Sequence, residues 1–269
     1  MNLFSSPFWT ISVIVVCYMA FGLLVYLFQG RLLYFPDDTG IDAAGSFGLR
    51  PWPSEKGYLG FTSAKPPSAP RGTFVVWHGN GGSALYRTYF AEALERRGYR
   101  VILAEYPGYG GRPGDLSEKS FVSDAVRTVD RVRREFSGPL YLVGESLGCG
   151  VAAAVARQRD WVSGVVLITP WAALPDLAQA KYWYFPARWL VRDQYDNIRN
   201  LSGYQGPVAV LIAENDEIVP RKHGQRLFDG LKTRKRLWMF KAAGHNSWPA
   251  DPDEKWWDEV VDFLSLKSE

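Results

Sequence analysis

A serine in a glycine-flanked turn is the residue of this chain best suited to covalent chemistry. Residues 144–148 read G-E-S-L-G, so Ser146 has a glycine two positions before it and another two positions after it. In a G-x-S-x-G turn the backbone of the serine is strained and its Oγ projects outward, and a side chain at either glycine position would collide with the turn. The pattern predicts that Ser146 is the nucleophile of an acyl-transfer reaction. The alternative is an ordinary glycine-rich turn whose serine caps the next helix.

A serine hydroxyl is a weak nucleophile, so it needs a base, and the base needs an acid that orients it. His245 lies in the turn A-G-H-N-S, and Asp216 lies upstream in the turn E-N-D-E-I-V-P. The chain order serine, aspartate, histidine is that of one large class of serine hydrolases. We predict that His245 is the base and Asp216 the acid. Glu214 and Glu217 are close rivals for the acid because they occupy the same turn.

A glycine-rich loop supplies the third part of such a site, the oxyanion hole. Residues 78–82 read H-G-N-G-G and follow an apolar run. Glycines let backbone N–H groups approach a developing oxyanion closely, so we expect the N–H groups of Asn80 and Leu147 to be the two donors. A phosphate-binding loop and a plain tight turn are the alternatives. The spacing does not fit the G-x-G-x-x-G fingerprint of dinucleotide-binding proteins.

The elements that must position these residues alternate along the chain. Short apolar runs alternate with helix-length segments, which predicts a mostly parallel sheet with helices on both faces. The expected serine, acid and base each follow the carboxyl end of an expected strand, so all three should face one crevice. The expected strands are 58–62, 73–77, 100–105, 140–144, 164–169, 207–213 and 236–240, and the expected helices are 86–97, 117–136, 147–158, 220–231 and 253–266.

The alternation lapses between two prolines, Pro170 and Pro207. Residues 171–206 are rich in tryptophan and tyrosine and show little helix or strand patterning. We expect a small cap over the carboxyl edge of the sheet, where an apolar surface would suit an acyl chain. The alternative is that these rings pack into the core. Residues 31–55 read as an irregular connector, and His223 reads as a surface residue of an amphipathic helix.

The beginning of the chain reads as a membrane span. Residues 8–28 contain no charged side chain, and 21 residues in a helix cross the ~30 Å hydrocarbon core of a bilayer. Trp9 near one end, with Tyr26 and Tyr34 near the other, suits the aromatic belts at the two membrane interfaces. A cleaved signal peptide is the main alternative, but no basic leader and no A-x-A-like cleavage site is evident. A buried core helix is the other alternative.

The domain organisation follows from this span. We predict that residues 1–30 form a single-pass anchor and that residues 31–269 form the catalytic domain, with a small cap at 171–206. Arg31 is the only basic residue close to either end of the span, which favours a cytoplasmic catalytic domain.

Composition excludes several other classes of function. The net charge is +3, and the basic runs 131–134 and 232–236 are expected to be solvated, with contact to anionic headgroups as the alternative, so nucleic acid is not an expected partner. The two cysteines, Cys17 and Cys149, are not expected to pair. The histidines and cysteines show no zinc-binding spacing, so neither a metal nor an organic cofactor is expected. Oligomeric state is not indicated.

Taken together, these stretches resemble the α/β-hydrolase-fold serine hydrolases, in the branch that carries an N-terminal membrane anchor. The resemblance implies an α/β-hydrolase fold and an esterase, thioesterase or lipid hydrolase without a cofactor. It also implies that the acid is Asp216 and the base His245. Six stretches carry it, namely L-L-Y-F-P at 32–36, H-G-N-G-G at 78–82, E-Y-P-G-Y-G at 105–110 with Glu105 where aspartate is usual, the serine turn at 144–148, Asp216 to Pro220, and Gly244-His245.

The sequence therefore predicts a membrane-anchored serine hydrolase that cleaves ester or thioester bonds of small acyl or lipid-like substrates. Two other classes stay open. One is a serine peptidase on the same fold, although the chain leaves little room for a peptide-selecting domain. The other is a non-catalytic membrane scaffold that has kept the fold.

Overall fold

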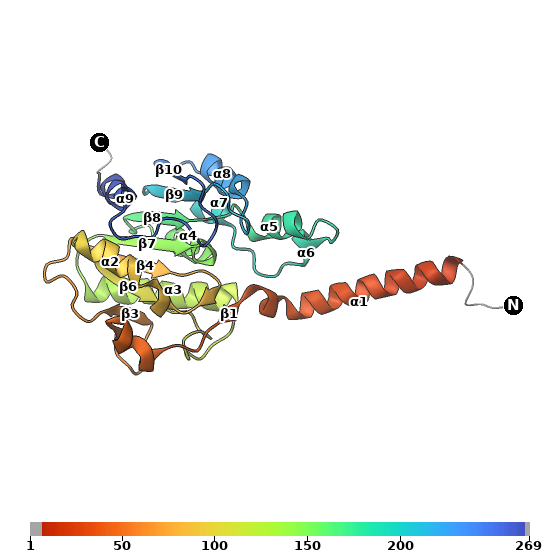
Figure 1. Cartoon of the computed structure of the whole chain (residues 1–269), viewed down its shortest axis with the longest axis horizontal. Helices are drawn as coiled ribbons and strands as arrows, with labels where there is room; N and C mark the ends of the chain where they lie inside the picture. The colour runs from red at the N-terminus through yellow and green to blue at the C-terminus, as the bar shows by residue number, and fades with distance from the viewer. Residues whose placement is uncertain (1–6, 267–269) are drawn as a thin grey trace.

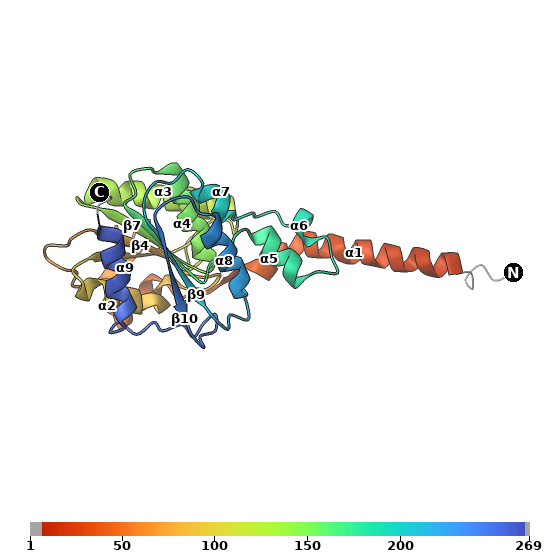
Figure 2. The ribbon, with the colours of Figure 1, turned by 90° about the horizontal axis from the view of Figure 1, so that it is seen from above.

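The computed structural model describes residues 7–266, and it consists of one long helix leading into an α/β domain (Figures 1 and 2). The helix is α1 (Pro7–Leu33). The strands of the large sheet are β2 (Leu49–Trp52), β3 (Gly60–Ser63), β4 (Thr73–Trp77), β6 (Arg100–Ala104), β7 (Leu140–Glu145), β8 (Gly164–Ile168), β9 (Val208–Ala213) and β10 (Lys235–Phe240). The other helices are η2 (Ile41–Phe47), η3 (Ala84–Arg87), α2 (Thr88–Arg96), α3 (Glu118–Glu135), α4 (Leu147–Gln158), α5 (Leu174–Lys181), α6 (Ala187–Leu190), α7 (Asn197–Leu201), α8 (Arg221–Gly230) and α9 (Lys255–Ser265).

The eight strands form one sheet in the order β10-β9-β8-β7-β4-β6-β3-β2. The six strands from β10 to β6 are parallel, and β3 and β2 are added antiparallel at one edge. The expectation of a mostly parallel central sheet is therefore confirmed. Trp77 at the end of β4 pairs with Gly144 of β7 on one side and Ala104 of β6 on the other, so the loops that follow these strands leave the sheet together.

The two faces of the sheet are covered by different helices because strand residues alternate between them. On β4, Val75 and Trp77 pack with α3, α4, α7 and α8, whereas Phe74 and Val76 pack with α2 and α9. Figure 2 shows α2 and α9 on one side of the sheet and α3, α4 and α7 on the other. Both faces of these strands are buried, which explains why their sequences are continuous apolar runs.

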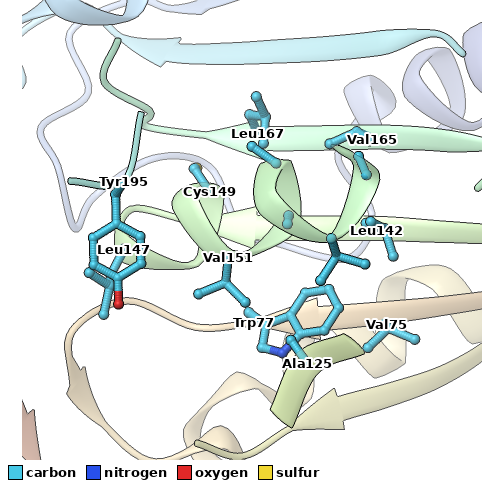
Figure 3. Packing of buried hydrophobic residues seen from close by; sticks show 14 of the residues in the cluster. Val75, Trp77, Ala125, Leu142, Leu147, Cys149, Val151, Val165, Leu167 and Tyr195 are labelled. Atoms are coloured by element: carbon cyan, nitrogen blue, oxygen red, sulfur yellow. The ribbon is translucent and has the colours of Figure 1, made fainter. Parts of the chain in front are cut away.

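The core beneath α4 fixes the position of the serine turn. The small side chains of α4 let the helix lie close against the sheet, and Cys149 and Val151 point into the layer formed by Trp77, Leu142 and Leu167 (Figure 3). Tyr195 belongs to the same buried cluster, and its ring lies against Gly150 of α4. A Cβ at that glycine would lie 2.4 Å from the ring, so only glycine lets Tyr195 approach this closely.

The region without clear patterning contains three short helices, α5, α6 and α7, which the sequence did not predict. Its aromatic side chains are found in both of the environments considered from the sequence, the core and the surface. Trp171 and Tyr195 are buried in the core, whereas Trp183 and Trp189 are 78% and 84% exposed. The 31–55 segment, expected to be irregular, contains η2 and the edge strand β2. Whether residues 171–206 work as a cap stays a prediction.

Two side chains lie elsewhere than their local sequence indicated. Tyr34, expected at a membrane interface, is buried, and its hydroxyl donates to Asp193 Oδ2 at 2.8 Å and lies 3.0 Å from the hydroxyl of Tyr195. His223, expected at the surface, is buried on α8, and burial lowers its pKa. The predicted anchor 1–30 and catalytic domain 31–269 include residues 1–6 and 267–269, which lie outside the described residues.

Candidate active site

Ser146 occupies a sharp turn between β7 and α4. Its backbone angles are φ 51° and ψ −111°, a conformation that non-glycine residues rarely adopt, and its N–H donates to the carbonyl of Ile168 at 2.9 Å. A Cβ at Gly144 would lie 2.4 Å from the backbone nitrogen of Cys149, and one at Gly148 would lie 2.1 Å from the carbonyl oxygen of Trp77. Both flanking positions therefore require glycine, and the strand-turn-helix context is the one that a nucleophile turn needs.

The structure brings the predicted serine, base and acid into one hydrogen-bonded chain. His245 Nε2 lies 2.9 Å from Ser146 Oγ, and His245 Nδ1 lies 2.7 Å from Asp216 Oδ2. The three residues are separated by up to 99 positions in sequence, and they meet because the turns after β7, β9 and β10 leave the same edge of the sheet. All three side chains are buried, with Ser146 only 8% exposed.

The acid turn distributes its three carboxylates among different partners. Asp216 Oδ1 accepts the backbone N–H groups of Ile218 and Val219 at 2.9 and 2.6 Å, which leaves Oδ2 directed at the histidine ring. Glu214 accepts the backbone N–H of Ala242 at 3.1 Å. Glu217 accepts the backbone N–H of His245 at 3.2 Å, so it holds the histidine loop but not the imidazole.

The glycine-rich loop after β4 lies beside the serine. A Cβ built on Gly79 would be 3.6 Å from the Cβ of Ser146, so this loop passes close to the serine. Within residues 7–266, the backbone N–H groups of Asn80 and Leu147 make no hydrogen bond to another group. Donors left unpaired next to a serine hydroxyl are what an oxyanion hole requires.

The loop is also tied to the end of α1. The side chain of Asn80 donates to the carbonyl of Leu33 at 2.7 Å, and the carbonyl of Asn80 accepts from the N–H of Phe35 at 2.9 Å and the hydroxyl of Tyr109 at 2.7 Å. β1 (Phe35–Pro36) and β5 (Gly81–Gly82) continue this contact as a short parallel pair. The expected oxyanion loop is thus held from both sides by groups outside it.

A buried polar network beneath the loop was not identified from the sequence as a site component. Glu105 Oε1 lies 2.9 Å from His78 Nε2, and Oε2 accepts the hydroxyl of Ser83 and the N–H of Ala84 at 2.8 and 2.9 Å. The hydroxyl of Tyr106 donates to the carbonyl of His78 at 2.7 Å. The sequence did contain a sign of this pair, because His78 and Glu105 each directly follow an apolar strand. The two strands, β4 and β6, are neighbours in the sheet, so the two side chains meet at its edge.

A second unanticipated group lies next to Ser146. Glu145, the residue before Ser146, accepts from Arg87 Nε at 2.6 Å and from the hydroxyl of Tyr89 at 3.3 Å. Burial and then the charge of Glu145 raise the pKa of Tyr89, so this phenol stays protonated and acts as a donor. The cluster attaches η3 and α2 to the carboxyl end of β7.

Cys149 lies one turn of α4 after the serine but is not a rival nucleophile. It is fully buried, and its Sγ lies 3.1 Å from the carbonyl of Gly144 and 3.3 Å from that of Ile168. Burial raises the pKa of this thiol well above its usual range, so the thiolate is not populated at neutral pH.

Comparison with known proteins gives a consistent result for the fold. The profile of the α/β-hydrolase fold matches residues 72–203. Uncharacterized protein Rv2307c of Mycobacterium tuberculosis is 30% identical over 252 residues, and the match covers 87% of each chain. The fold expected from the sequence is therefore confirmed.

Two further relatives carry names that describe lipid hydrolysis. Lysophosphatidylserine lipase ABHD12 of Gallus gallus is 26% identical over 261 residues, covering 81% of this chain and 68% of that lipase. The crystal structure of a monoacylglycerol lipase from Paleococcus ferrophilus is 25% identical with a TM-score of 0.57, covering 75% of this chain and 96% of that one.

Proposed function

This chain belongs to the α/β-hydrolase family, and we propose that it is a membrane-anchored serine hydrolase that cleaves the ester or thioester bonds of acyl and lipid-like substrates. The observation that carries the proposal is the continuous contact from Asp216 through His245 to the Oγ of a strained Ser146. A buried serine in an unfavourable backbone conformation, in contact with a histidine that is itself held by a carboxylate, is the arrangement that nucleophilic catalysis needs.

In the proposed mechanism His245 Nε2 takes the proton of Ser146 while Oγ attacks the carbonyl carbon. The carbonyl oxygen becomes an oxyanion, which the N–H groups of Asn80 and Leu147 stabilise by roughly 3 kcal/mol each. The protonated His245 then donates its proton to the leaving alkoxide or thiolate, and an acyl-enzyme remains on Ser146. A water molecule, deprotonated by His245, hydrolyses the acyl-enzyme and restores the serine.

Asp216 has a positional and electrostatic role in this mechanism. Its contact with Nδ1 keeps a proton on that nitrogen, so Nε2 is free to accept the proton of Ser146. The same carboxylate stabilises the imidazolium that forms during the reaction. The two backbone N–H groups that it accepts hold its orientation.

The substrate class follows from the named relatives and from α1. A lysophosphatidylserine and a monoacylglycerol are each a glycerol-based lipid with one acyl chain, and the corresponding lipases are similar to this chain. Over the residues that the structure describes, one helix, α1, is long and apolar enough to cross a membrane. We therefore propose α1 as the anchor and a single-chain acyl lipid as the substrate type.

The test is labelling of the full-length protein in detergent with a fluorophosphonate, which reacts with activated serines. We expect labelling of the unmodified protein and none of Ser146→Ala, together with loss of short p-nitrophenyl ester hydrolysis in that variant. Equal labelling of both proteins would place the reactive serine elsewhere. An unlabelled but folded protein would instead support the non-catalytic scaffold.

A further inference from the structure

The segment between α5 and α7 lies against the apolar helix α1. The hydroxyl of Tyr18 donates to the carbonyl of Tyr184 at 3.0 Å, and the ring of Phe185 lies 4.9 Å from that of Tyr18 and 6.1 Å from that of Phe21, centroid to centroid. Gly22 is the buried residue of α1, and a Cβ there would come within 2.5 Å of the Phe185 ring. Figure 1 shows α5 and α6 beside the end of α1 that is attached to the domain.

The contact continues toward the end of α1. Gln29 donates from Nε2 to the carbonyl of Leu190 at 3.1 Å and accepts the backbone N–H of Arg192 at 2.8 Å. The guanidinium of Arg192 lies 5.5 Å from the centre of the Tyr26 ring. Residues 182–192 therefore follow α1 from Tyr18 to Gln29.

The length of α1 shows where residues 182–192 would lie relative to a membrane that α1 crosses. At ~1.5 Å per residue, the part of the helix between Pro7 and Tyr18 is about 16 Å long, roughly half of the ~30 Å hydrocarbon core. If residues 182–190 stayed in water, the free part of α1 would be too short to cross a bilayer. A spanning α1 thus requires that the segment beside its second half enters the membrane as well.

The surface of the segment suits that environment. Residues 182–187 carry no charged side chain. Four rings are exposed on the segment, those of Tyr182, Trp183, Tyr184 and Trp189. Tyrosine and tryptophan concentrate where a bilayer meets water, because their apolar rings and polar hydrogen-bonding groups are both accommodated there.

Basic side chains flank these rings. Lys181 lies just before them, Arg188 lies among them in an ion pair with Asp176 at 2.6 Å, and Arg192 lies just after them. At the membrane–water interface, long basic side chains direct their charged groups toward lipid phosphates while their aliphatic stems stay in apolar surroundings. An aromatic surface with a basic border is the pattern expected at the headgroup level of a membrane.

We propose that residues 182–190 are immersed in the bilayer beside α1 and form a second membrane contact of this protein. The inference rests on the anchor in the proposed function and deepens it. The segment follows α5 (Leu174–Lys181), which comes after β8 in the chain.

The test measures the depth of single labels in the full-length protein, reconstituted in vesicles of phosphatidylcholine and phosphatidylserine. The native Cys17 is exposed on α1 and Cys149 is buried, so nitrobenzoxadiazole attaches at Cys17 alone. In a Cys17→Ser background, Trp183→Cys and Trp189→Cys place the label on the segment. Lys56→Cys places it on an exposed loop between β2 and β3 as the matched control. Quenching by doxyl-labelled lipids reports immersion.

We expect quenching at Cys17, Trp183→Cys and Trp189→Cys and none at Lys56→Cys. Quenching at Cys17 without quenching at the two tryptophan positions would overturn the inference and leave the anchor intact. Absence of quenching at all positions would overturn both. Fluorophosphonate labelling in detergent, which needs a folded site but no bilayer, checks each variant and tests the serine chemistry separately.

Discussion

At the residue scale, the acid of the proposed triad is selected by hydrogen bonds rather than by proximity in sequence. Asp216 directs one oxygen at His245 and anchors the other on two backbone N–H groups. Glu214 and Glu217 accept backbone N–H groups of Ala242 and His245 in the loop after β10. All three are carboxylates in one turn, so the sequence favoured Asp216 as the acid but could not exclude the two glutamates.

This division of roles predicts the ranking of three conservative variants. Asp216→Asn presents an amide to Nδ1 and favours the wrong tautomer, so we expect kcat for a short ester to fall by about 10³–10⁴-fold. Glu214→Gln keeps an acceptor for a backbone N–H, and we expect a loss of less than about tenfold, with Glu217→Gln intermediate. Steady-state kinetics of the three proteins in detergent gives the ranking. A larger loss in Glu214→Gln than in Asp216→Asn would reassign the acid.

A second residue-scale prediction concerns Glu95, which is half-buried on α2. Burial is the largest cause that raises its pKa to about 7, and a hydrogen bond from Ser63 opposes the rise. Its Oε1 has no hydrogen-bond partner within residues 7–266. The folded state therefore holds this proton more tightly than the unfolded state, so the free energy of unfolding falls as pH rises from about 4.5 to 7.

The variant Glu95→Gln removes that titration. We expect it to be more stable than the unmodified protein at pH 8, on the order of 1 kcal/mol because part of the side chain remains solvated, and to differ less at pH 5. Thermal unfolding of the full chain in detergent across this range measures the effect. A stability difference that does not change with pH would contradict the assignment.

Single side chains were the hardest features to predict when their partners are distant in sequence. Tyr34 reads as an interface aromatic but is buried against Asp193 and Tyr195, about 160 positions away. His223 reads as part of a polar helix face but is buried. Local patterning carries no information about such long-range pairs, whereas the serine turn is specified by its own five residues.

At the scale of elements, the buried parallel strands and their helices were predicted well because each is a self-contained pattern. α4 begins at residue 147 and ends at 158, as the pattern indicated, and β4 occupies 73–77. β2 was missed because its sequence contains Pro51 and it lies at the edge of the sheet. α5, α6 and α7 have eight, four and five residues, too few for a helical period to emerge.

The contact between α4 and β4 gives an element-scale prediction. Gly148→Ala places a Cβ 2.1 Å from the carbonyl oxygen of Trp77, and backbone on both sides must shift to relieve the clash. Because the same backbone leads into the proposed oxyanion loop, we expect kcat for a short ester to fall at least tenfold and the thermal midpoint to drop. Gly203→Ala, which meets no atom within 4 Å, is the matched control and should change neither. Normal activity in Gly148→Ala would mean that the close approach is not needed.

At the scale of the whole molecule, α1 and the α5–α6 region form one unit through the contact at Gly22. Gly22→Leu forces a branched side chain against the Phe185 ring and should separate the helix from residues 182–190. We expect several-fold slower hydrolysis of a single-chain acyl lipid in vesicles, with unchanged hydrolysis of a soluble short ester in detergent. Gly30→Leu, on the same helix with nothing within 4 Å, should leave both rates unchanged. An equal loss on both substrates in Gly22→Leu would point to damage within the active site instead.

The short link between α1 and the proposed oxyanion loop has a consequence for which membrane would supply the proposed lipid substrate. No free tether separates the two, since Leu33 accepts from Asn80 and Phe35 pairs with Gly81. If α1 is inserted as proposed, the α/β domain cannot reach a neighbouring bilayer, and we expect the protein to act in cis, on the membrane that carries it. Its rate should then follow the mole fraction of substrate within that membrane, and substrate supplied in separate vesicles should be hydrolysed only after it has exchanged between them.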